Sequence, residues 1–224
     1  MTNRHVFTDH SSLVLRSITG LVNSQPNLSA ITSIKTVINA NHDENKVSLI
    51  CGGGSGHEPG STGFVGRGLL SASVCGDVFA SPSARQVYGA MKAVPSKKGT
   101  LLIITNCTLF FFDWCRLKLN NDATDTGDNL HFGLACQQAR ADGAQNVDIL
   151  PVGDDVSVGR TKGALVGRRA LAGTILGQLR SLCFENVYQY YTQYAKYSVR
   201  RPKPIGLSTT CANLVLASPV PLLQ

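Results

Sequence analysis

Apolar and polar positions along the first 176 residues follow helical and strand patterns in turn. Apolar side chains at helical spacing between Leu13 and Val22 predict an amphipathic helix that stops before Gln25-Pro26. Short apolar runs predict buried strands at 46–51, 100–105 and 146–152. Further helices are predicted from the N-cap residue Ser81 to about Ala93, from Leu130 to Ala141, and from about Lys162 to Leu176.

Strands separated by helices indicate an α/β fold, with a mainly parallel sheet covered by helices on both faces. In folds of this kind, ligands bind where the strands reach their carboxyl ends. We therefore expect the functional residues of this chain in the segments that follow the predicted strands.

A glycine-rich segment, residues 52–59, follows the first predicted strand. It has the sequence Gly-Gly-Gly-Ser-Gly-His-Glu-Pro, and glycines without Cβ atoms let backbone N–H groups approach a small polar ligand closely. The spacing matches no dinucleotide fingerprint, because His57 and Pro59 stand where glycine is needed, and no Gly-Lys-Ser/Thr of a P-loop follows. Because His57 is suited to proton exchange near neutral pH, a ligand site is favoured over a structural turn with a chance histidine.

Composition excludes several classes of protein. Hydrophobic residues make up 43% of the 224 residues, which is too many for a disordered chain. The longest apolar runs fall far short of the roughly 20 residues that cross a bilayer, and the N-terminus lacks the apolar core of a secretory signal, so a cytosolic protein is predicted. The seven cysteines form no C-x-x-C pair, which argues against both a disulfide framework and a thiolate zinc site.

The net charge of +7 is concentrated at the C-terminal end of the chain. Residues 177–224 hold five Lys or Arg and one acid, which leaves 16 basic against 13 acidic residues elsewhere. The body of the chain is therefore close to neutral, and neither nucleic acid nor a membrane is expected as a partner. The less favoured alternative is that the tyrosine-rich, basic segment 177–224 binds nucleic acid or a membrane, because the spacing of its tyrosines follows no amphipathic period.

Two segments differ in composition from the rest of the chain. Ten of the fifteen aromatic residues lie within 109–126 and 177–224, whereas 20 of the 22 glycines lie outside them. We expect 109–126 to be an insertion into the α/β domain. The segment 177–224 is expected to be a divergent, irregular tail rather than an independent domain.

A series of ordered motifs begins at the glycine-rich segment. In chain order they are Gly52 to Pro59, Gly63 to Gly66, Gly76 to Pro82, Gly99 to Ile104, Asn129 to Ala135, Ala139 to Gly143, Val152 to Val156, Gly167 to Arg169 and Leu171 to Thr174. Together they resemble the substrate-binding K domain (DhaK domain) of dihydroxyacetone kinases, most closely the fungal ATP-dependent type. The resemblance covers about 4–108 and 127–176, so we predict a first K-type subdomain over 1–176 that is interrupted at 109–126.

The resemblance implies phosphoryl transfer from ATP to a terminal hydroxyl of dihydroxyacetone (glycerone) in glycerol and triose catabolism. ATP and Mg would be bound by a separate helical domain that these 224 residues do not contain, so no cofactor and no metal are expected on this chain. The family's substrate-contacting stretch falls on Gly54, Ser55, Gly56 and His57, and its acid/base carboxylate falls on Asp128. Asp128 would accept a hydroxyl proton while His57 hydrogen-bonds the triose. Taken by itself, Asp128 is an ordinary loop aspartate.

The chain departs from the family pattern at this predicted site. Thr105 and Cys107 stand where the family has Lys and Tyr, and 109–126 separates them from Gly127-Asp128, which follow directly in the family. We interpret 109–126 as translated intron, with an evolved lid as the alternative. No histidine follows His131, so the family's histidine that binds the triose carbonyl as a hemiaminal has no counterpart here.

Two functions are consistent with these observations. The first is a dihydroxyacetone kinase, represented here by a truncated substrate-binding fragment. The second is a non-catalytic triose-binding or interaction protein derived from a kinase K domain, which the missing histidine favours for this chain in isolation. K domains of the family are dimers, so a homodimer is expected. Asp154-Asp155 are not predicted to bind a metal, because no third ligand has suitable spacing.

Overall fold

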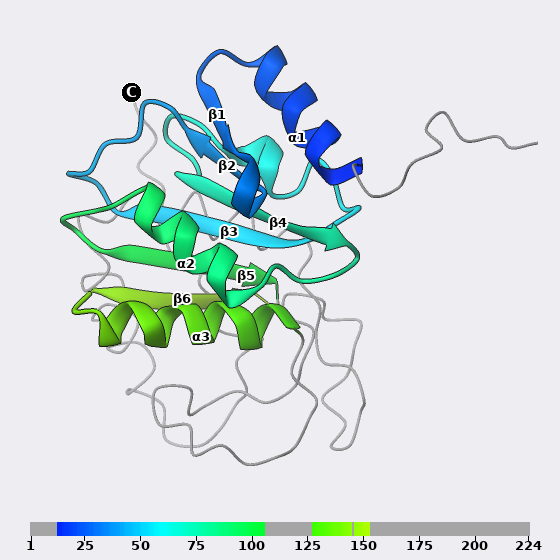
Figure 1. Cartoon of the computed structure of the whole chain (residues 1–224). Coiled ribbons are helices and arrows are strands. Elements are labelled where there is room, and N and C mark those ends of the chain that lie inside the picture. The colour runs from blue at the N-terminus through cyan, green and yellow to red at the C-terminus, as the bar shows by residue number, and fades with distance from the viewer. Residues whose placement is uncertain (1–12, 106–126, 145, 153–224) are drawn as a thin grey trace, which may run out of the picture.

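The strands of the computed structural model form a six-stranded sheet in the order β1-β2-β4-β3-β5-β6 (Figure 1). The structure describes residues 13–105, 127–144 and 146–152. The strands are β1 (Leu28–Ile31), β2 (Thr36–Asn39), β3 (Ser48–Ser55), β4 (Ala72–Val78), β5 (Thr100–Thr105) and β6 (Val147–Val152). Each of the three strands predicted from the sequence is present, as β3, β5 and β6.

Four of the six strands, β3 to β6, run parallel to one another. β3 pairs with β4 on one side and with β5 on the other, and β5 pairs with β6. β2 lies antiparallel to β4, and β1 lies antiparallel to β2, so a hairpin completes one edge of the sheet. The sequence pattern does not predict this hairpin, because each of its strands has only four residues.

Helices cover both faces of the sheet, which confirms the predicted α/β class. The helix α1 (Leu13–Ser24) packs with Val14 and Ile18 on one face, and α2 (Ala84–Ala93) and α3 (Gly127–Ala141) pack on the other. Successive residues of the central strands supply the two cores in alternation. In β5, Leu101 and Ile103 belong to the core beneath α1, whereas Leu102 and Ile104 belong to the core beneath α2 and α3. This burial on both sides explains why the strand sequence is apolar throughout.

The helix α2 begins later than the sequence predicts. Its N-cap is Ser83, whose side chain accepts a hydrogen bond from the backbone N–H of Gln86, while the Gln86 side chain accepts one from the backbone N–H of Ser83. This reciprocal capping box outweighs the Ser81-Pro82 signal, so the prediction of Ser81 as the N-cap is wrong. The helix α3 begins at Gly127, three residues before the predicted start, and Asp128 therefore lies in its first turn rather than in a loop.

The strand β3 continues through the glycine-rich segment instead of ending at Cys51. Gly52 pairs with Val74 of β4 and Ile104 of β5, and the strand reaches Ser55. A Cβ atom on Gly52 would lie 2.4 Å from the carbonyl oxygen of Val74, so the close approach of β4 depends on glycine here. The glycines therefore build the end of a strand, and the turn begins only at Gly56.

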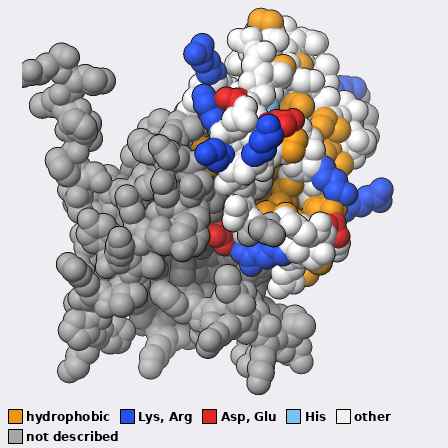
Figure 2. Space-filling view, turned by 90° about the vertical axis from the view of Figure 1, so that its left-hand side faces the viewer, with side chains coloured by type: hydrophobic (Ala, Val, Ile, Leu, Met, Phe, Trp, Pro, Cys, Tyr) orange, Lys and Arg blue, Asp and Glu red, His pale blue; other side chains and the backbone are white. Residues whose placement is uncertain are grey.

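Several predictions lie outside the described residues. These are the helix over 162–176, the insertion 109–126, the tail 177–224 and the Asp154-Asp155 pair. Among the helices that the structure describes, none is long and apolar enough to cross a membrane. On the face drawn in Figure 2, the coloured part of the surface carries basic and acidic side chains close to one another.

Candidate functional site

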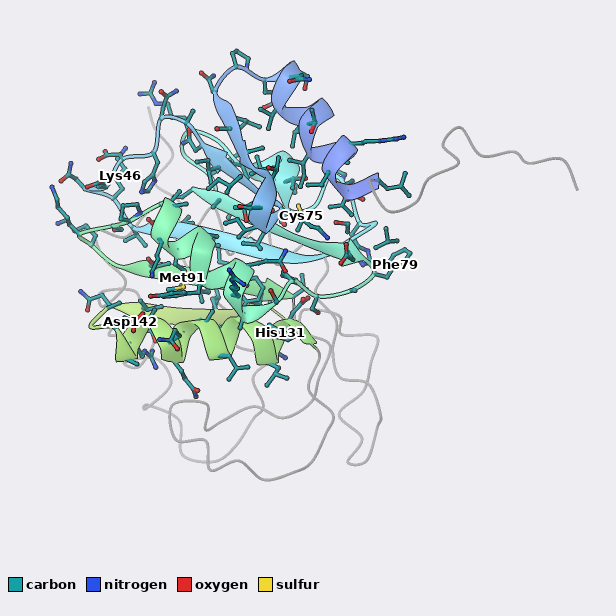
Figure 3. All side chains as sticks on the ribbon, in the orientation of Figure 1. Lys46, Cys75, Phe79, Met91, His131 and Asp142 are labelled. Carbon is teal, nitrogen blue, oxygen red and sulfur yellow. The ribbon has the colours of Figure 1, made fainter. Side chains whose placement is uncertain are left out.

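The carboxyl ends of three neighbouring strands meet at one edge of the sheet. β3 ends in Gly53, Gly54 and Ser55, and β5 ends in Thr105. β4 leads into the turn around Phe79, which lies at the same end of the molecule as the start of α3 (Figure 3). The residues predicted to bind substrate therefore come together with Asp128 at the carboxyl ends of the strands, where α/β folds bind ligands.

Asp128 lies close to the ends of both β5 and β3. The hydroxyl of Thr105 donates a hydrogen bond to Asp128 Oδ2 at 3.2 Å. The place that a Cβ atom of Gly53 would take lies 3.2 Å from the same oxygen. A residue with a side chain at position 53 would thus press on the carboxylate, so this glycine makes room for it.

Burial raises the pKa of the Asp128 carboxyl above its ordinary value. Hydrogen bonds from Ser81 and Thr105 oppose the rise, and so does the charge of His131 and, to a smaller extent, that of His57. The position in the first turn of α3 also favours the ionised form, because the helix dipole places partial positive charge there. The result is a carboxylate that is more basic than one in water.

The second oxygen of this carboxylate, Oδ1, has an open hydrogen-bonding position. It is buried, and no donor within the described part of the chain reaches it. Buried acceptors in proteins are nearly always paired, and one without a partner needs an explanation, such as a catalytic role or a bound water or ion. Thr105 holds Oδ2, so Oδ1 is the oxygen of Asp128 that is left to accept a further hydrogen bond.

The glycine-rich segment turns sharply beside this carboxylate. Gly56 has a φ of +111°, which favours glycine, and its backbone N–H donates to Glu58 Oε2 at 2.9 Å. Ser55 is buried, and its hydroxyl donates to the carbonyl oxygen of Gly76 at 2.9 Å. The Ser55 side chain therefore ties β3 to β4, and the backbone carbonyl oxygen of Ser55 accepts a hydrogen bond from the backbone N–H of Phe79 at 2.8 Å. His57 follows the turn and is close enough to Asp128 for its charge to lower the pKa of the carboxyl.

Three residues of the site were not identified from the sequence as site residues. Glu58 fixes the turn at Gly56, Phe79 packs against His57, and Ser81 lowers the pKa of the Asp128 carboxyl. The ring centroids of Phe79 and His57 are 5.4 Å apart at an interplanar angle of 73°. The Glu58 contact is local, whereas the Phe79 contact depends on the pairing of β3 with β4 and the effect of Ser81 on the position of α3, neither of which the sequence gives. Within 13–105, 127–144 and 146–152, no group of three or more His, Cys, Asp or Glu could hold a metal ion.

The fold and the site define an α/β domain that presents a glycine-rich strand end, a histidine and a buried carboxylate at the carboxyl edge of a largely parallel sheet. Such an edge is suited to a small polar ligand. The model of the Dak1 domain matches residues 19–109 and 123–178, and the chain belongs to this family. The resemblance inferred from the sequence motifs is thereby confirmed.

Known relatives agree with this assignment. A dihydroxyacetone kinase of Komagataella pastoris is 48% identical over 177 residues, which cover 79% of this chain and 26% of the kinase. The crystal structure of the dihydroxyacetone kinase from Citrobacter freundii in complex with AMP-PNP and Mg²⁺ has a TM-score of 0.68 at 37% identity, covering 86% of this chain and 34% of the other. A dihydroxyacetone kinase operon co-activator has a TM-score of 0.63 at 26% identity, covering 80% and 51%.

The chain spans about a quarter of the length of the fungal relative, 26%. The activity of whole kinases is therefore carried to this chain as a proposal. The boundaries 1–176, 109–126 and 177–224 remain predictions, as do the substrate-binding roles of Gly54, Ser55, Gly56, His57 and Asp128.

Proposed function

We propose that this chain is the substrate-binding part of a dihydroxyacetone kinase, which holds dihydroxyacetone or a related triose at the carboxyl edge of β3 and β5. The observation that carries the proposal is the buried Oδ1 of Asp128, which has no hydrogen-bond partner among the described residues, while Thr105 holds Oδ2 beside Gly53. A triose offers a hydroxyl donor for this oxygen. The kinase relatives supply the substrate class.

In this proposal Asp128 acts as the general base toward a terminal hydroxyl of the triose. A raised pKa makes the carboxylate a stronger acceptor for the hydroxyl proton than an aspartate in water. His57, which follows the turn at Gly56, hydrogen-bonds an oxygen of the triose. The backbone of Gly54 and Gly56 would allow close approach of the ligand, since these residues carry no Cβ atoms.

The phosphoryl donor would be ATP with Mg²⁺, bound by a different domain from the one described. ATP supplies the phosphoryl group that the triose hydroxyl receives. A cytosolic location and a homodimer of K-type domains belong to the same proposal. Neither nucleic acid nor a membrane is proposed as a partner.

A second candidate function is binding without catalysis. It is favoured by the structural likeness to an operon co-activator and by Thr105, which is uncharged where the family pattern has Lys. In this case the chain would bind a triose weakly or pair with other K-type domains. The two functions share the ligand site and differ in turnover.

Ligand titration of the purified chain tests the shared site. We expect dihydroxyacetone to perturb the NMR signals of His57 and of the backbone from Gly53 to Gly56. His57→Asn and Asp128→Asn should each weaken binding by about tenfold or more, since the first removes the imidazole and the second the negative charge that strengthens the hydrogen bond to the triose. Matched controls are His42→Asn and Asp43→Asn, which lie in the loop before β3. Equal affinity in all four variants would contradict the site.

Turnover separates the two candidate functions. Dihydroxyacetone phosphate formed from ATP by the chain, when supplied with the remaining domains of a kinase relative, would support the first. Saturable binding of dihydroxyacetone without any product under the same conditions would support the second. A chain that shows neither binding nor turnover would contradict both.

A further inference from the structure

Phe79 has an unusual position for a large apolar side chain. It lies in the turn after β4, it is 72% exposed, and its backbone φ of +52° falls in the left-handed region. Non-glycine residues are uncommon in this region, and bulky ones are disfavoured there. Neither burial in the core nor backbone preference therefore accounts for phenylalanine at this position.

The contacts of Phe79 are made with the glycine-rich segment. Its backbone N–H donates to the carbonyl oxygen of Ser55 at 2.8 Å, which fixes the turn against the end of β3. Its ring lies where a side chain on Gly56 would be, since a Cβ atom there would be 2.9 Å from Phe79 Cε1. Gly54 meets the same turn, because its Cβ would lie 3.0 Å from the carbonyl carbon of Phe79. The glycines at 54 and 56 thus accommodate Phe79.

The ring also meets His57 in an edge-to-face arrangement, with centroids 5.4 Å apart and planes inclined by 73°. This is a favourable geometry for an aromatic pair. His57 follows a glycine turn and would otherwise be free to take several rotamers. A side chain whose rotamer is fixed before the ligand arrives loses less entropy on binding.

We infer that Phe79 is a positioning residue for His57, and that its ring holds the imidazole in the orientation in which it meets the triose. The inference rests on the proposed function only for the identity of the ligand. Figure 3 shows the Phe79 side chain projecting from the end of the sheet. Val78, which is 50% exposed and directly precedes Phe79, supplies a matched control.

NMR spectra of histidine-labelled chain test the inference without any ligand. The signals of His57 are assigned by their loss in His57→Asn. In Phe79→Leu, which removes the ring and keeps an apolar side chain, the His57 ring protons should lose their ring-current shift and the His57 side-chain couplings should average over rotamers. Phe79→Tyr should retain both features, and Val78→Ala should leave them unchanged. Thermal unfolding should differ little between Phe79→Leu and the wild type, because the ring is mostly exposed.

Titration with dihydroxyacetone then tests the consequence for binding. The affinity should fall about two- to tenfold in Phe79→Leu and be restored in Phe79→Tyr, in line with the strength of an aromatic pair. Wild-type His57 shifts and couplings in Phe79→Leu would overturn the inference, as would an equal loss of affinity in Phe79→Tyr. If the His57 signals depend on Phe79 but do not respond to dihydroxyacetone in the wild type, the positioning role holds and the proposed function fails.

Discussion

Thr105, the last residue of β5, donates its hydroxyl hydrogen to Oδ2 of Asp128 in the first turn of α3 at 3.2 Å. The two residues are 23 positions apart in the chain, and the predicted insertion 109–126 lies between them. Position 105 is also where the family pattern has Lys. The residue type at this position therefore acts directly on the proposed general base.

Replacing Thr105 should change the ionisation of Asp128 in opposite directions. Thr105→Lys brings a cation beside the carboxylate and should lower the pKa of Asp128, whereas Thr105→Val removes a donor and should raise it further. Thr105→Val should also reduce the free energy of unfolding by about 1 kcal/mol. NMR titration of the Asp128 carboxyl carbon measures the pKa in both variants. The same pKa in both would mean that the contact is absent in solution.

Asp128→Asn should stabilise the fold near neutral pH. The folded state raises the pKa of Asp128, so between the unfolded value of about 3.9 and the higher folded value the folded state binds more protons than the unfolded one. Stability therefore falls as pH rises through this window, and the neutral amide avoids that loss. Urea unfolding at a series of pH values should show the variant and the wild type converging in acid and the variant more stable above the window.

Asp43→Asn is a control for which the change in stability should have the opposite sign. The backbone N–H of Asn45 lowers the pKa of the exposed Asp43, so its contribution to stability is present above the unfolded pKa and is lost as pH falls. The amide should therefore slightly destabilise the fold at neutral pH.

A wild type more stable than Asp128→Asn at pH 7 would contradict the burial of an ionised Asp128.

Substitution by alanine should affect stability and ligand binding differently at Gly52 and at Gly53 of β3. In Gly52→Ala the new Cβ would lie 2.4 Å from the backbone oxygen of Val74, which has no room to move, so the loss of stability should exceed about 2 kcal/mol. In Gly53→Ala the nearest atom is Asp128 Oδ2 at 3.2 Å, which belongs to a side chain that can shift. This variant should lose less than about 1 kcal/mol but bind dihydroxyacetone more weakly. Chemical denaturation and ligand titration separate the two effects, and equal loss of stability would show that Gly53 is structural.

Cys51 and Cys75 should resist alkylation in the native protein. Burial raises the pKa of each thiol to about 12, so the reactive thiolate is scarce near neutral pH. Iodoacetamide at pH 8 followed by peptide mass spectrometry should leave both residues unmodified, and modification should appear once denaturant is added. Rapid labelling of Cys51 without denaturant would contradict its position in the central strand.

A chimera tests whether the site supports catalysis. It would lack 109–126, carry Thr105→Lys and Cys107→Tyr, and continue after Leu176 with the remaining parts of a fungal dihydroxyacetone kinase. We expect ATP-dependent phosphorylation of dihydroxyacetone, and His57→Ala or Asp128→Ala in the chimera should each lower kcat by about 10² to 10⁴. His42→Ala is the control. Unchanged turnover in both site variants would exclude this site as the catalytic centre.

The fold class and the general place of the site can be predicted from the sequence alone. Apolar runs such as Leu101 to Ile104 are buried on both faces, and their length and flanking residues are sufficient to predict parallel strands. The glycine-rich segment could be assigned to a strand end because glycine has a direct stereochemical meaning. Motif order then led to the family, which the Dak1 match confirmed.

The contacts between the residues of the site follow from the tertiary structure and cannot be predicted from the sequence. The sequence places Thr105, Gly53 and Asp128 in three separate segments, and the parallel pairing of β3 with β5 and the packing of α3 bring them to one carboxylate. The sequence likewise does not predict the contact between Phe79 and His57, because that contact depends on the register between β3 and β4. Local patterns encode burial and chain direction, whereas the partners of a side chain at the sheet edge depend on pairing between segments far apart in the chain.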